Sequence, residues 1–337
     1  MNMAFTELSG ASLFVTGGTG SFGRGLVRLL LAKRVDFARL VVYSRDELKQ
    51  LQMQRAFSDT RLRYFIGDVR DRDRLTEAMQ GIDLAIHAAA LKQVPAAEYN
   101  PMEYIKTNVN GAENVIHAAR ANRVQKVIAL SSDKAAHPVG LYGATKLCSD
   151  KLFVAANNFA GGRHTRFAVT RYGNVVGSRG SVLPHFRRLL RNGVAALPVT
   201  DRRMTRFWIT LNEGVAFVLA NFGRMQGGEI FVPKSPSIRV VDLAEALAPD
   251  IPTHVIGIRP GEKLHEVMCP GDEAHLTIEY PDHFVMHPVI VSFEEAVDYT
   301  RNPRGERGTR VADEFEYHSG RNPHFLTVPE IRTMIGS

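Results

Sequence analysis

The sequence predicts an α/β fold of the Rossmann type, in which a doubly wound parallel sheet precedes a smaller α/β C-terminal lobe. Short apolar runs, typical of strands buried on both faces, alternate with helical patterns over the first half of the chain. The first of these runs leads straight into a glycine-rich turn and a helix. A later run ends in a polar stretch that another helix follows. This order of elements is that of a dinucleotide-binding domain.

The composition is that of an ordinary globular protein. Of the 337 residues, 45% are hydrophobic, which is enough for one large core with an appended lobe. No apolar run approaches the roughly eighteen residues of a membrane helix, and residues 1–10 lack the pattern of a signal peptide. The two cysteines, Cys148 and Cys269, are too few for a disulfide framework or a metal cage. We therefore expect a cytoplasmic protein that binds neither a membrane nor a metal.

The chain carries a net charge of +7 and has a pI near 9.5. Its basic residues are scattered, without interleaved aromatic residues, and it has no nucleic-acid-binding motif, so we expect no nucleic-acid partner. A basic cleft for phosphate groups explains the excess charge. An undirected, solvated surface is the alternative.

The first predicted strand, residues 12–16, runs into a glycine turn and a helix at 26–32. Gly17, Gly20 and Gly23 have the spacing G-x-x-G-x-x-G. Such a turn lets the backbone approach a pyrophosphate closely and directs the amino terminus of the helix at it.

The second strand, residues 40–43, ends in Ser44 and Arg45 and not in the acidic residue that would bind a ribose 2′-hydroxyl. Arg45, with Ser44 and Lys49, is better matched to a 2′-phosphate, which favours NADP over NAD. Two acidic residues after Arg45 weigh against this, although they also suit the first turn of a helix at 46–57.

The third and fourth strands end in residues that face the same edge of the sheet. Residues 63–66 reach Asp68, which could also cap a helix at 72–79. Residues 84–87 lead to three alanines, small enough for a flat cofactor to lie on the strand end. Lys92 follows and should border the cleft, the alternative being a solvated loop lysine.

A helical pattern at 101–122 precedes the fifth strand, residues 127–130, which ends in a polar stretch that includes Ser132. Tyr142 and Lys146 lie one turn apart on one face of the next helix, predicted at 142–160. An ammonium there would lower the pKa of the tyrosine towards neutrality, as a general base requires. By itself, such a pair is more often a surface feature.

The glycine turn, Ser132, Tyr142 and Lys146 together resemble the short-chain dehydrogenase/reductase superfamily, in the extended branch that modifies nucleotide sugars. The resemblance implies that Ser132 orients the substrate hydroxyl, Tyr142 removes its proton and Lys146 holds the nicotinamide ribose. It also places Asp68 against the adenine. The implied NADP site comprises Gly17, Gly20, Ser21, Phe22, Gly23, Ser44, Arg45, Lys49, Asp68, Val69, Ala88, Ala89, Lys92, Tyr142 and Lys146.

The second half of the chain is less regular. A sixth strand at 165–170 leads to the glycine-rich segment 171–184, where the substrate-binding lobe of the family begins. We assign residues 1–178 to the NADP-binding domain, with a return of roughly 204–234, and residues 179–337 mainly to the lobe. The further predicted elements are a helix at 183–191, a strand at 197–200, a segment 204–210 that opens a helix at 211–222, a strand at 228–232 returning to the sheet, a helix at 240–247, a strand at 253–258 and a terminal helix at 328–335.

Segments along almost the whole chain are similar to the configuration-inverting UDP-N-acetylglucosamine 4,6-dehydratases, NADP-dependent lyases that begin pseudaminic acid synthesis. The adjacent Asp133 and Lys134 discriminate within the superfamily, because expelling water from C6 needs an acid and a base beyond the redox residues. Lys134 would take the C5 proton, and Asp133 would protonate the leaving hydroxyl. A desolvated or cation-flanked lysine can fall to a pKa at which it acts as a base. A surface ion pair is the alternative.

The resemblance implies UDP-N-acetylglucosamine as substrate and UDP-2-acetamido-2,6-dideoxy-β-L-arabino-hex-4-ulose as product. The candidate substrate-binding residues are Lys92, Asn174, Val182, Thr200, Arg206, Arg259 and Glu262. Ordinary salt bridges are the alternative for the charged ones. A UDP-hexose 4-epimerase and a non-catalytic, NADP-binding scaffold protein are the rival functions. The family forms homodimers or larger homo-oligomers, which we expect here.

Overall fold

The computed structural model describes residues 3–158, 165–178, 180–259, 261–290 and 297–336. Its centre is a ten-stranded sheet in the order β16-β14-β15-β10-β6-β5-β4-β1-β2-β3, and the seven strands from β10 to β3 are parallel. These seven are β1 (Ser12–Thr16), β2 (Arg39–Ser44), β3 (Leu62–Ile66), β4 (Leu84–His87), β5 (Lys126–Ser132), β6 (Arg166–Tyr172) and β10 (Ile230–Pro233).

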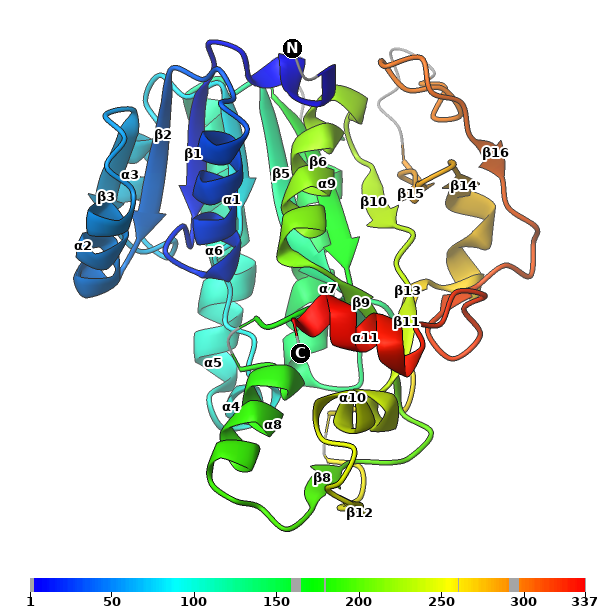
Figure 1. Cartoon of the computed structure of the whole chain (residues 1–337). Helices are drawn as coiled ribbons and strands as arrows, with labels where there is room; N and C mark the ends of the chain where they lie inside the picture. Colours follow the sequence, from blue (N-terminus) through cyan, green and yellow to red (C-terminus); the bar gives the residue numbers. More distant parts are fainter. Residues whose placement is uncertain (1–2, 159–164, 179, 260, 291–296, 337) are drawn as a thin grey trace.

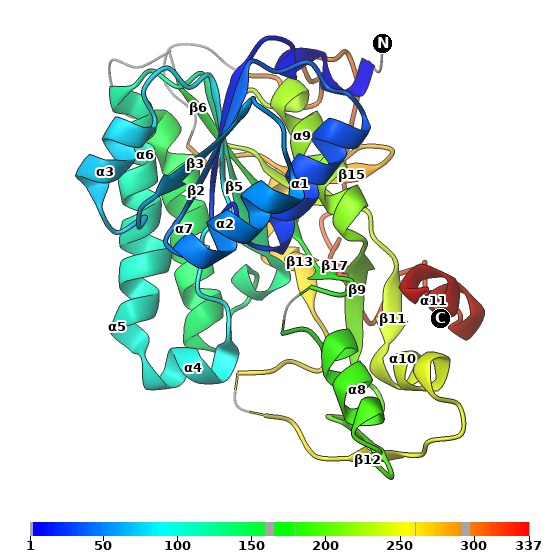
Figure 2. The same cartoon turned by 60° about the vertical axis from the view of Figure 1, so that its left-hand side comes forward.

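Helices cover both faces of the sheet (Figures 1 and 2). One face carries α1 (Ser21–Ala32), α2 (Glu47–Ala56) and α9 (Leu211–Arg224), and the other carries α3 (Arg72–Ala78), α6 (Gly111–Ala121) and α7 (Leu141–Ala155). Each layer has its own apolar core: Leu26 and Val218 lie in one, and Leu75 and Phe153 in the other. The predicted Rossmann-type fold with its smaller lobe is confirmed.

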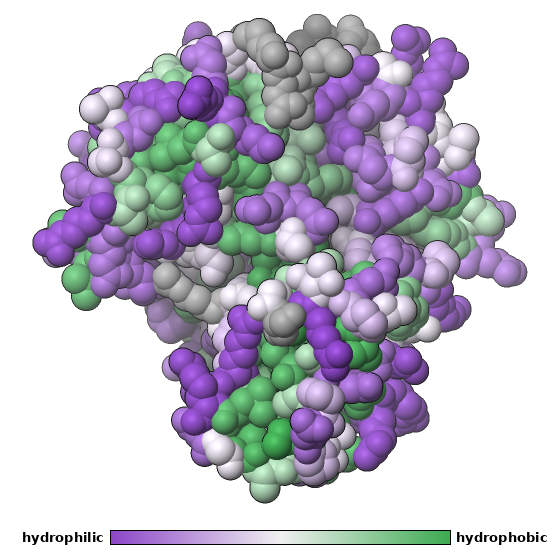
Figure 3. Space-filling model, viewed as in Figure 1, coloured by the Kyte–Doolittle hydropathy of each residue, from purple (hydrophilic) through white to green (hydrophobic). Residues whose placement is uncertain are grey.

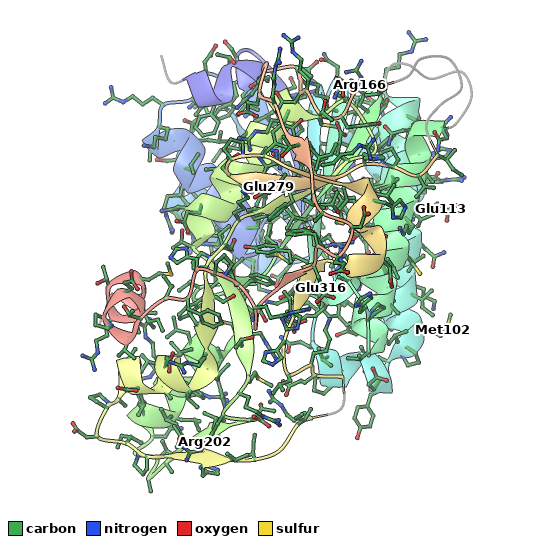
Figure 4. All side chains as sticks on the ribbon, turned by 90° about the vertical axis from the view of Figure 1, so that its right-hand side faces the viewer. Met102, Glu113, Arg166, Arg202, Glu279 and Glu316 are labelled. Atoms are coloured by element: carbon green, nitrogen blue, oxygen red, sulfur yellow. The ribbon has the colours of Figure 1, made fainter. Side chains whose placement is uncertain are left out.

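The smaller lobe lies beyond the carboxyl edge of the parallel strands, at the bottom of Figure 1. It packs around a third core that includes Phe186, Trp208 and Leu243. Its elements are β7 (Asn174–Val175), α8 (Val182–Arg191), β8 (Leu197–Val199), β9 (Thr205–Ile209), β11 (Ser237–Arg239), α10 (Val240–Leu247), β12 (Thr253–Val255), β13 (Val267–Cys269), β17 (Tyr317–His318) and α11 (Val328–Ile335). In Figure 4, Arg202 of this lobe and Arg166 at the start of β6 mark opposite ends of the molecule, and Figure 3 shows an apolar area on the lobe's surface.

Several predicted elements differ in detail from the structure. The helix expected at 101–122 is divided into α5 (Pro101–Tyr104), a π-helical turn (Ile105–Asn110) and α6, preceded by the short α4 (Val94–Tyr99). The segment 204–210 contains a strand, β9, which pairs with β7 and β11. The strand predicted at 253–258 ends at Val255, and residues 159 and 160 of the helix predicted at 142–160 lie outside the described residues.

The chain returns to the main sheet a second time, which the sequence does not predict. Strands β14 (Thr277–Glu279), β15 (His283–Met286) and β16 (Thr309–Arg310) extend the sheet beyond β10 with antiparallel pairing. The strands β14 to β16 are thus a second part of residues 179–337, after β10, that belongs to the main sheet. The division of the chain at residue 178 stays a prediction.

Polar side chains fix where several helices begin. Asp46 accepts a hydrogen bond from the backbone of Lys49 at the start of α2, and Thr210 and Glu213 form a capping box at the start of α9. Asp71, and not Asp68, caps α3. Asp68 instead accepts hydrogen bonds from the backbone and guanidinium of Arg70, so the alternative of Asp68 as a cap was wrong.

A buried ion pair joins the two central strands to the helix between them. Arg171 of β6 donates to Asp150 Oδ2 of α7 at 3.1 Å, and both side chains are at most 2% exposed. The hydroxyl of Ser131, in β5, donates to the same oxygen at 2.7 Å. The second guanidinium nitrogen donates to the carbonyl of Met268 in β13 at 2.9 Å. The pair therefore links β5, α7, β6 and the lobe.

Removing one charge of this pair leaves the other buried without compensation. We predict that Asp150→Asn lowers the free energy of unfolding by about 3–5 kcal/mol, measured by urea denaturation. Lys151→Ala on the same helix is the matched control. Lys151 forms an ion pair with Glu273 but is 54% exposed, so its loss should cost less than about 1 kcal/mol. Equal effects of the two substitutions would contradict the prediction.

Candidate active site

A cavity of about 570 Å³ lies at the carboxyl edge of the parallel strands, where they meet the start of the lobe. This is where open α/β sheets bind ligands. Most of the predicted site residues line it: Gly17, Gly20, Ser21, Phe22, Ser44, Arg45, Lys49, Asp68, Val69, Ala88, Ala89, Lys92, Ser132, Asp133, Lys134, Tyr142, Lys146 and Asn174. The structure thus brings the predicted cofactor and catalytic residues to one cavity, although their roles stay predictions.

The cavity lining does not include Gly23, Val182, Thr200, Arg206, Arg259 or Glu262. Gly23 is buried in α1, and a Cβ there would lie 2.0 Å from the carbonyl oxygen of Gly18. This glycine therefore allows α1 to pack on the turn.

The glycine turn forms a cradle that fits a pyrophosphate. Gly17 has a φ of +62°, and a Cβ on it would lie 2.9 Å from the backbone of Ala89, so the ends of β1 and β4 meet without a side chain between them. Gly20 precedes α1 without a side-chain cap. The amino terminus of α1 is therefore available to an anion.

The ends of β1 and β4 are joined by a buried hydroxyl that the sequence did not single out. Thr16 Oγ1 accepts hydrogen bonds from the backbone nitrogens of Ala88 and Ala89, each at 3.1 Å, and lies 2.8 Å from His87 Nδ1. Since it already accepts two hydrogen bonds, the hydroxyl donates to Nδ1. Burial, with a smaller effect of the Lys146 charge, lowers the pKa of His87 to about 3. His87 is therefore a neutral support beneath the site.

The end of β2 carries a loosely held cation. The guanidinium of Arg45 is 53% exposed and lies 3.6 Å from Asp68 Oδ2. Asp68 is held more closely by Arg70, at 2.8 Å, and the ammonium of Lys49 pairs with Asp46. Burial raises the pKa of Asp68, but the hydrogen bonds and charges of Arg70 and Arg45 outweigh it and lower that pKa overall. Of the two cations predicted to bind the 2′-phosphate, Arg45 is therefore the less closely paired.

Tyr142 lies at the first turn of α7 and faces Ser132. Burial raises the pKa of Tyr142 to about 12, with only partial opposition from the charge of Lys134 and a hydrogen bond to Ser132. The ammonium of Lys146 donates to the carbonyl of Leu130 at 2.7 Å, and burial lowers the pKa of Lys146. The expectation that Lys146 would lower the pKa of the tyrosine was therefore wrong for this structure. The lowering contribution comes from the charge of Lys134, and it is smaller than the effect of burial.

Asp133 and Lys134 form a short 3-10 turn directly after β5. Lys134 Nζ donates to Asp133 Oδ1 at 2.9 Å and lies 3.1 Å from Oε1 of Glu266, a residue that the sequence did not single out. Ser132 Oγ also donates to Asp133 Oδ1, at 2.9 Å. Asp133 Oδ2 is buried and has no hydrogen-bond partner among the described residues.

The charges around Lys134 correct one expectation. Burial lowers the pKa of Lys134, but the negative charges of Asp133 and Glu266 outweigh it and raise that pKa above its ordinary value. The two carboxylates outweigh the nearby cation Arg206, so the predicted fall of the Lys134 pKa was wrong. The ammonium is the stable form in this structure.

Asn108, in the π-helical turn, supports the loop that precedes Lys92. Its side chain accepts from the backbone nitrogen of Leu91 and donates to the carbonyl of Leu91 and to Thr145 Oγ1. Lys92 borders the cavity with Gln93, as predicted, and burial together with the charge of Lys134 lowers its pKa.

The remaining substrate candidates are already paired within the protein. The guanidinium of Arg206 donates to the carbonyls of Thr205, Lys263 and Leu264. Arg259 pairs with Glu262, which also accepts from Thr200 at 3.4 Å. Val182 begins α8. Asn174, by contrast, lines the cavity, and its Oδ1 is buried without a partner among the described residues.

No group of three or more His, Cys, Asp or Glu side chains among the described residues is placed to hold a metal ion. Every helix in that part of the chain is too short or too polar to span a bilayer.

The sequence is similar to known proteins over nearly its full length. A family model described as polysaccharide biosynthesis protein matches residues 13–288. The inverting UDP-N-acetylglucosamine 4,6-dehydratase of Campylobacter jejuni subsp. jejuni serotype O:23/36 (strain 81-176) is 55% identical over 327 residues, which cover 97% of this chain and 98% of the relative. The UDP-glucose 4-epimerase of Rickettsia canadensis (strain McKiel) is 39% identical over 328 residues, covering 95% and 94%.

Solved structures show the same fold. Pen from Bacillus thuringiensis superimposes with a TM-score of 0.86 at 35% identity and covers 97% of this chain and 98% of its own. The dTDP-glucose 4,6-dehydratase DesIV from Streptomyces venezuelae, solved with NAD and TYD bound, has a TM-score of 0.65 at 26% identity and covers 75% and 86%.

Proposed function

This chain belongs to the family of polysaccharide biosynthesis proteins and, within it, to the configuration-inverting UDP-N-acetylglucosamine 4,6-dehydratases, and we propose that it dehydrates UDP-N-acetylglucosamine with inversion at C5. The product is the L-arabino 4-keto-6-deoxy sugar, and pseudaminic acid synthesis is the pathway that the resemblance implies. The similarity to the Campylobacter jejuni enzyme, which covers almost all of both chains, supports this class of reaction.

The adjacent Asp133 and Lys134 carry the proposal. For elimination, Lys134 must be neutral to take the C5 proton and Asp133 must be protonated to release O6 as water. Lys134 Nζ donates to Asp133 Oδ1 at 2.9 Å, so one proton that moves along this hydrogen bond produces both forms together. After the elimination, the ammonium and the carboxylate are restored.

The steps assigned to the chain follow from these positions. Ser132 orients the O4 hydroxyl, and Tyr142 removes its proton as the C4 hydride leaves for the bound dinucleotide. A ketone is left at C4, and the C5 proton becomes acidic. Lys134 takes that proton, and the electron pair of the C5–H bond moves into the enolate. As the C6–O bond breaks, Asp133 donates its proton to the departing oxygen. Once a hydride has been delivered to C6, C5 is reprotonated from the opposite face.

The cavity fits a nicotinamide dinucleotide, because the glycine turn and the open amino terminus of α1 form a cradle for a pyrophosphate. A dinucleotide held there would supply the hydride acceptor for C4 and the hydride donor for C6. We propose NADP over NAD because Arg45 lines the cavity with its guanidinium half exposed. Lys146 would hold the nicotinamide ribose, and Lys92 and Asn174 would contact the sugar.

A UDP-hexose 4-epimerase is the second candidate, since a relative with that name is 39% identical to this chain. An epimerase needs only the redox residues and has no use for the Asp133–Lys134 pair. A cytoplasmic location and a homodimer or higher homo-oligomer stay predictions from the sequence.

We predict that the purified protein with NADP converts UDP-N-acetylglucosamine to a product that has lost one water, as measured by mass spectrometry. NMR of the product should show the 6-deoxy group and the inverted C5. A product of unchanged mass would support the epimerase. Unchanged substrate in the presence of bound cofactor would support the scaffold protein.

We predict that Lys134→Ala still oxidises C4 but slows the elimination by about 10²–10⁴-fold, because it removes a general base. Single-turnover absorbance should then show reduced cofactor that persists, together with a 4-keto sugar that keeps its 6-hydroxyl. Lys106→Ala, which removes a surface lysine paired with Glu103, is the control and should react at the wild-type rate. Near wild-type dehydration by Lys134→Ala would exclude Lys134 as the base.

We predict that Arg45→Ala weakens binding of NADPH by about 10–100-fold, the loss expected for a charge-assisted hydrogen bond, and leaves NADH binding nearly unchanged. Fluorescence titration with both cofactors measures this. Arg70→Ala is the matched control, because Arg70 also pairs with Asp68 but does not line the cavity. Equal losses for NADPH and NADH would show that Arg45 does not read the 2′-phosphate.

A further inference from the structure

Glu266 is a buried carboxylate at the meeting point of three cations. Its side chain is 2% exposed, and it lies 3.1 Å from Lys134, 3.2 Å from Lys263 and 3.7 Å from Arg206. It does not line the cavity. It belongs to the segment just before β13, so the second half of the chain supplies the carboxylate that faces Lys134.

Glu266 is held firmly from behind. Its backbone nitrogen donates a hydrogen bond to Ser319 Oγ at 2.9 Å, which restrains the backbone at this position. Lys263 also donates to the carbonyl of Ala136 at 2.8 Å, which ties the same segment to the turn after Asp133 and Lys134. The carboxylate is therefore fixed relative to the Lys134 ammonium.

We propose that Glu266 is a positioning residue for the elimination, which holds Lys134 Nζ beside Asp133 and supplies a counter-charge for the ammonium that forms when Lys134 takes the C5 proton. This inference rests on the proposed dehydratase function. It assigns to the C-terminal half of the chain a part in the proton transfer and not only in substrate binding.

The physical reason is the cost of creating a charge in a buried place. Lys134 has a side chain 27% exposed, and its conversion from amine to ammonium would be opposed by desolvation and by the nearby cations Lys92 and Arg206. Asp133 offsets part of this cost, but it gives up its proton to O6 only once the C6–O bond breaks. Glu266 carries its charge throughout. It therefore favours the ammonium at the moment when Asp133 is still protonated.

A purely structural role for Glu266 is the alternative. Lys263 and Arg206 would then be the partners that matter, and Lys134 would keep its proton affinity without Glu266. The two possibilities differ in what happens to Lys134. Five charged or titratable groups among the described residues face Lys134. They are Asp133 in the same 3-10 turn, Tyr142 in α7, Lys92 in the loop after β4, and Arg206 and Glu266 in the second half of the chain.

The test is Glu266→Gln, which keeps the shape of the side chain and removes its charge. We expect kcat for dehydration to fall about tenfold, less than the roughly 10²–10⁴-fold loss expected when the general base itself is removed. KM for UDP-N-acetylglucosamine should change less than about threefold, because Glu266 does not line the cavity. With substrate deuterated at C5, the isotope effect on kcat should increase, since the proton transfer becomes the slow step. The reactivity of Lys134 is measured by competitive acetylation of the holoenzyme at fixed pH, followed by peptide mass spectrometry. In the variant, Lys134 should react about tenfold faster relative to Lys106 than in the wild type, because a pKa lowered by about one unit raises the neutral fraction tenfold.

The controls separate charge from folding. Glu266→Asp keeps the charge and should restore the wild-type isotope effect. Glu306→Gln removes a carboxylate from the buried Arg224 and should leave the isotope effect and the reactivity of Lys134 as in the wild type. If Glu266→Gln does not fold, the double variant Glu266→Gln, Lys263→Met replaces it. This double variant removes one negative and one positive charge, so no unpaired Lys263 is left, and Lys134 still loses the negative charge of Glu266.

An unchanged isotope effect or unchanged Lys134 reactivity in a folded variant would overturn the role of Glu266. The wild-type enzyme is assayed first for loss of water from UDP-N-acetylglucosamine. Failure there would remove the proposed function. If the wild-type enzyme dehydrates the substrate and Glu266→Gln leaves the isotope effect and the Lys134 reactivity unchanged, only the proposed role of Glu266 is excluded.

Discussion

The buried contact between Asp150 and Arg171 is the constraint on which the geometry of the site depends. It joins α7 to β6, receives Ser131 from β5 and reaches the carbonyl of Met268 in the second half of the chain. The polar end of β5, the helix that carries Tyr142 and the strand leading into the lobe are therefore fixed to one another. A buried ion pair adds little to stability compared with an apolar replacement, but it fixes a single arrangement when every partner is in place. Small displacements matter in a site that must hold reacting atoms at hydrogen-bond distance.

The two lysines of the cavity show how the same fold sets different proton affinities. Lys146 donates to the carbonyl of Leu130, and burial lowers its pKa despite the charge of Asp150. Lys134 lies between Asp133 and Glu266, and their charges raise its pKa despite its burial. The carboxylates in contact with Lys134 account for the opposite direction of its shift. Tyr142 lines the same cavity as the two lysines, and its pKa responds to the charge of Lys134.

Much of this arrangement could be predicted from the sequence because it depends on neighbours in the chain. The glycine turn follows a strand directly, Tyr142 and Lys146 are one helical turn apart, and Asp133 precedes Lys134, so local patterns place all of them. Glu266 lies 132 residues after Lys134, and no local spacing reveals that contact. The pKa of Lys134 could not be predicted for the same reason. Strands β14 to β16 have two to four residues each, too few for a period of two to be recognised.

The reach of Arg171 to the carbonyl of Met268 has a consequence for how the chain acquires its shape during synthesis. Strands β1 to β6 and the helices between them can begin to associate once residue 172 has left the ribosome. At that stage the guanidinium of Arg171 has Asp150 but not its carbonyl partner, 97 residues further along. Until residue 268 has been translated, the guanidinium between the central strands lacks one of its hydrogen-bond partners. The strands that carry Ser132 and Arg171 are therefore complete well before the last contact that fixes them to one another can form.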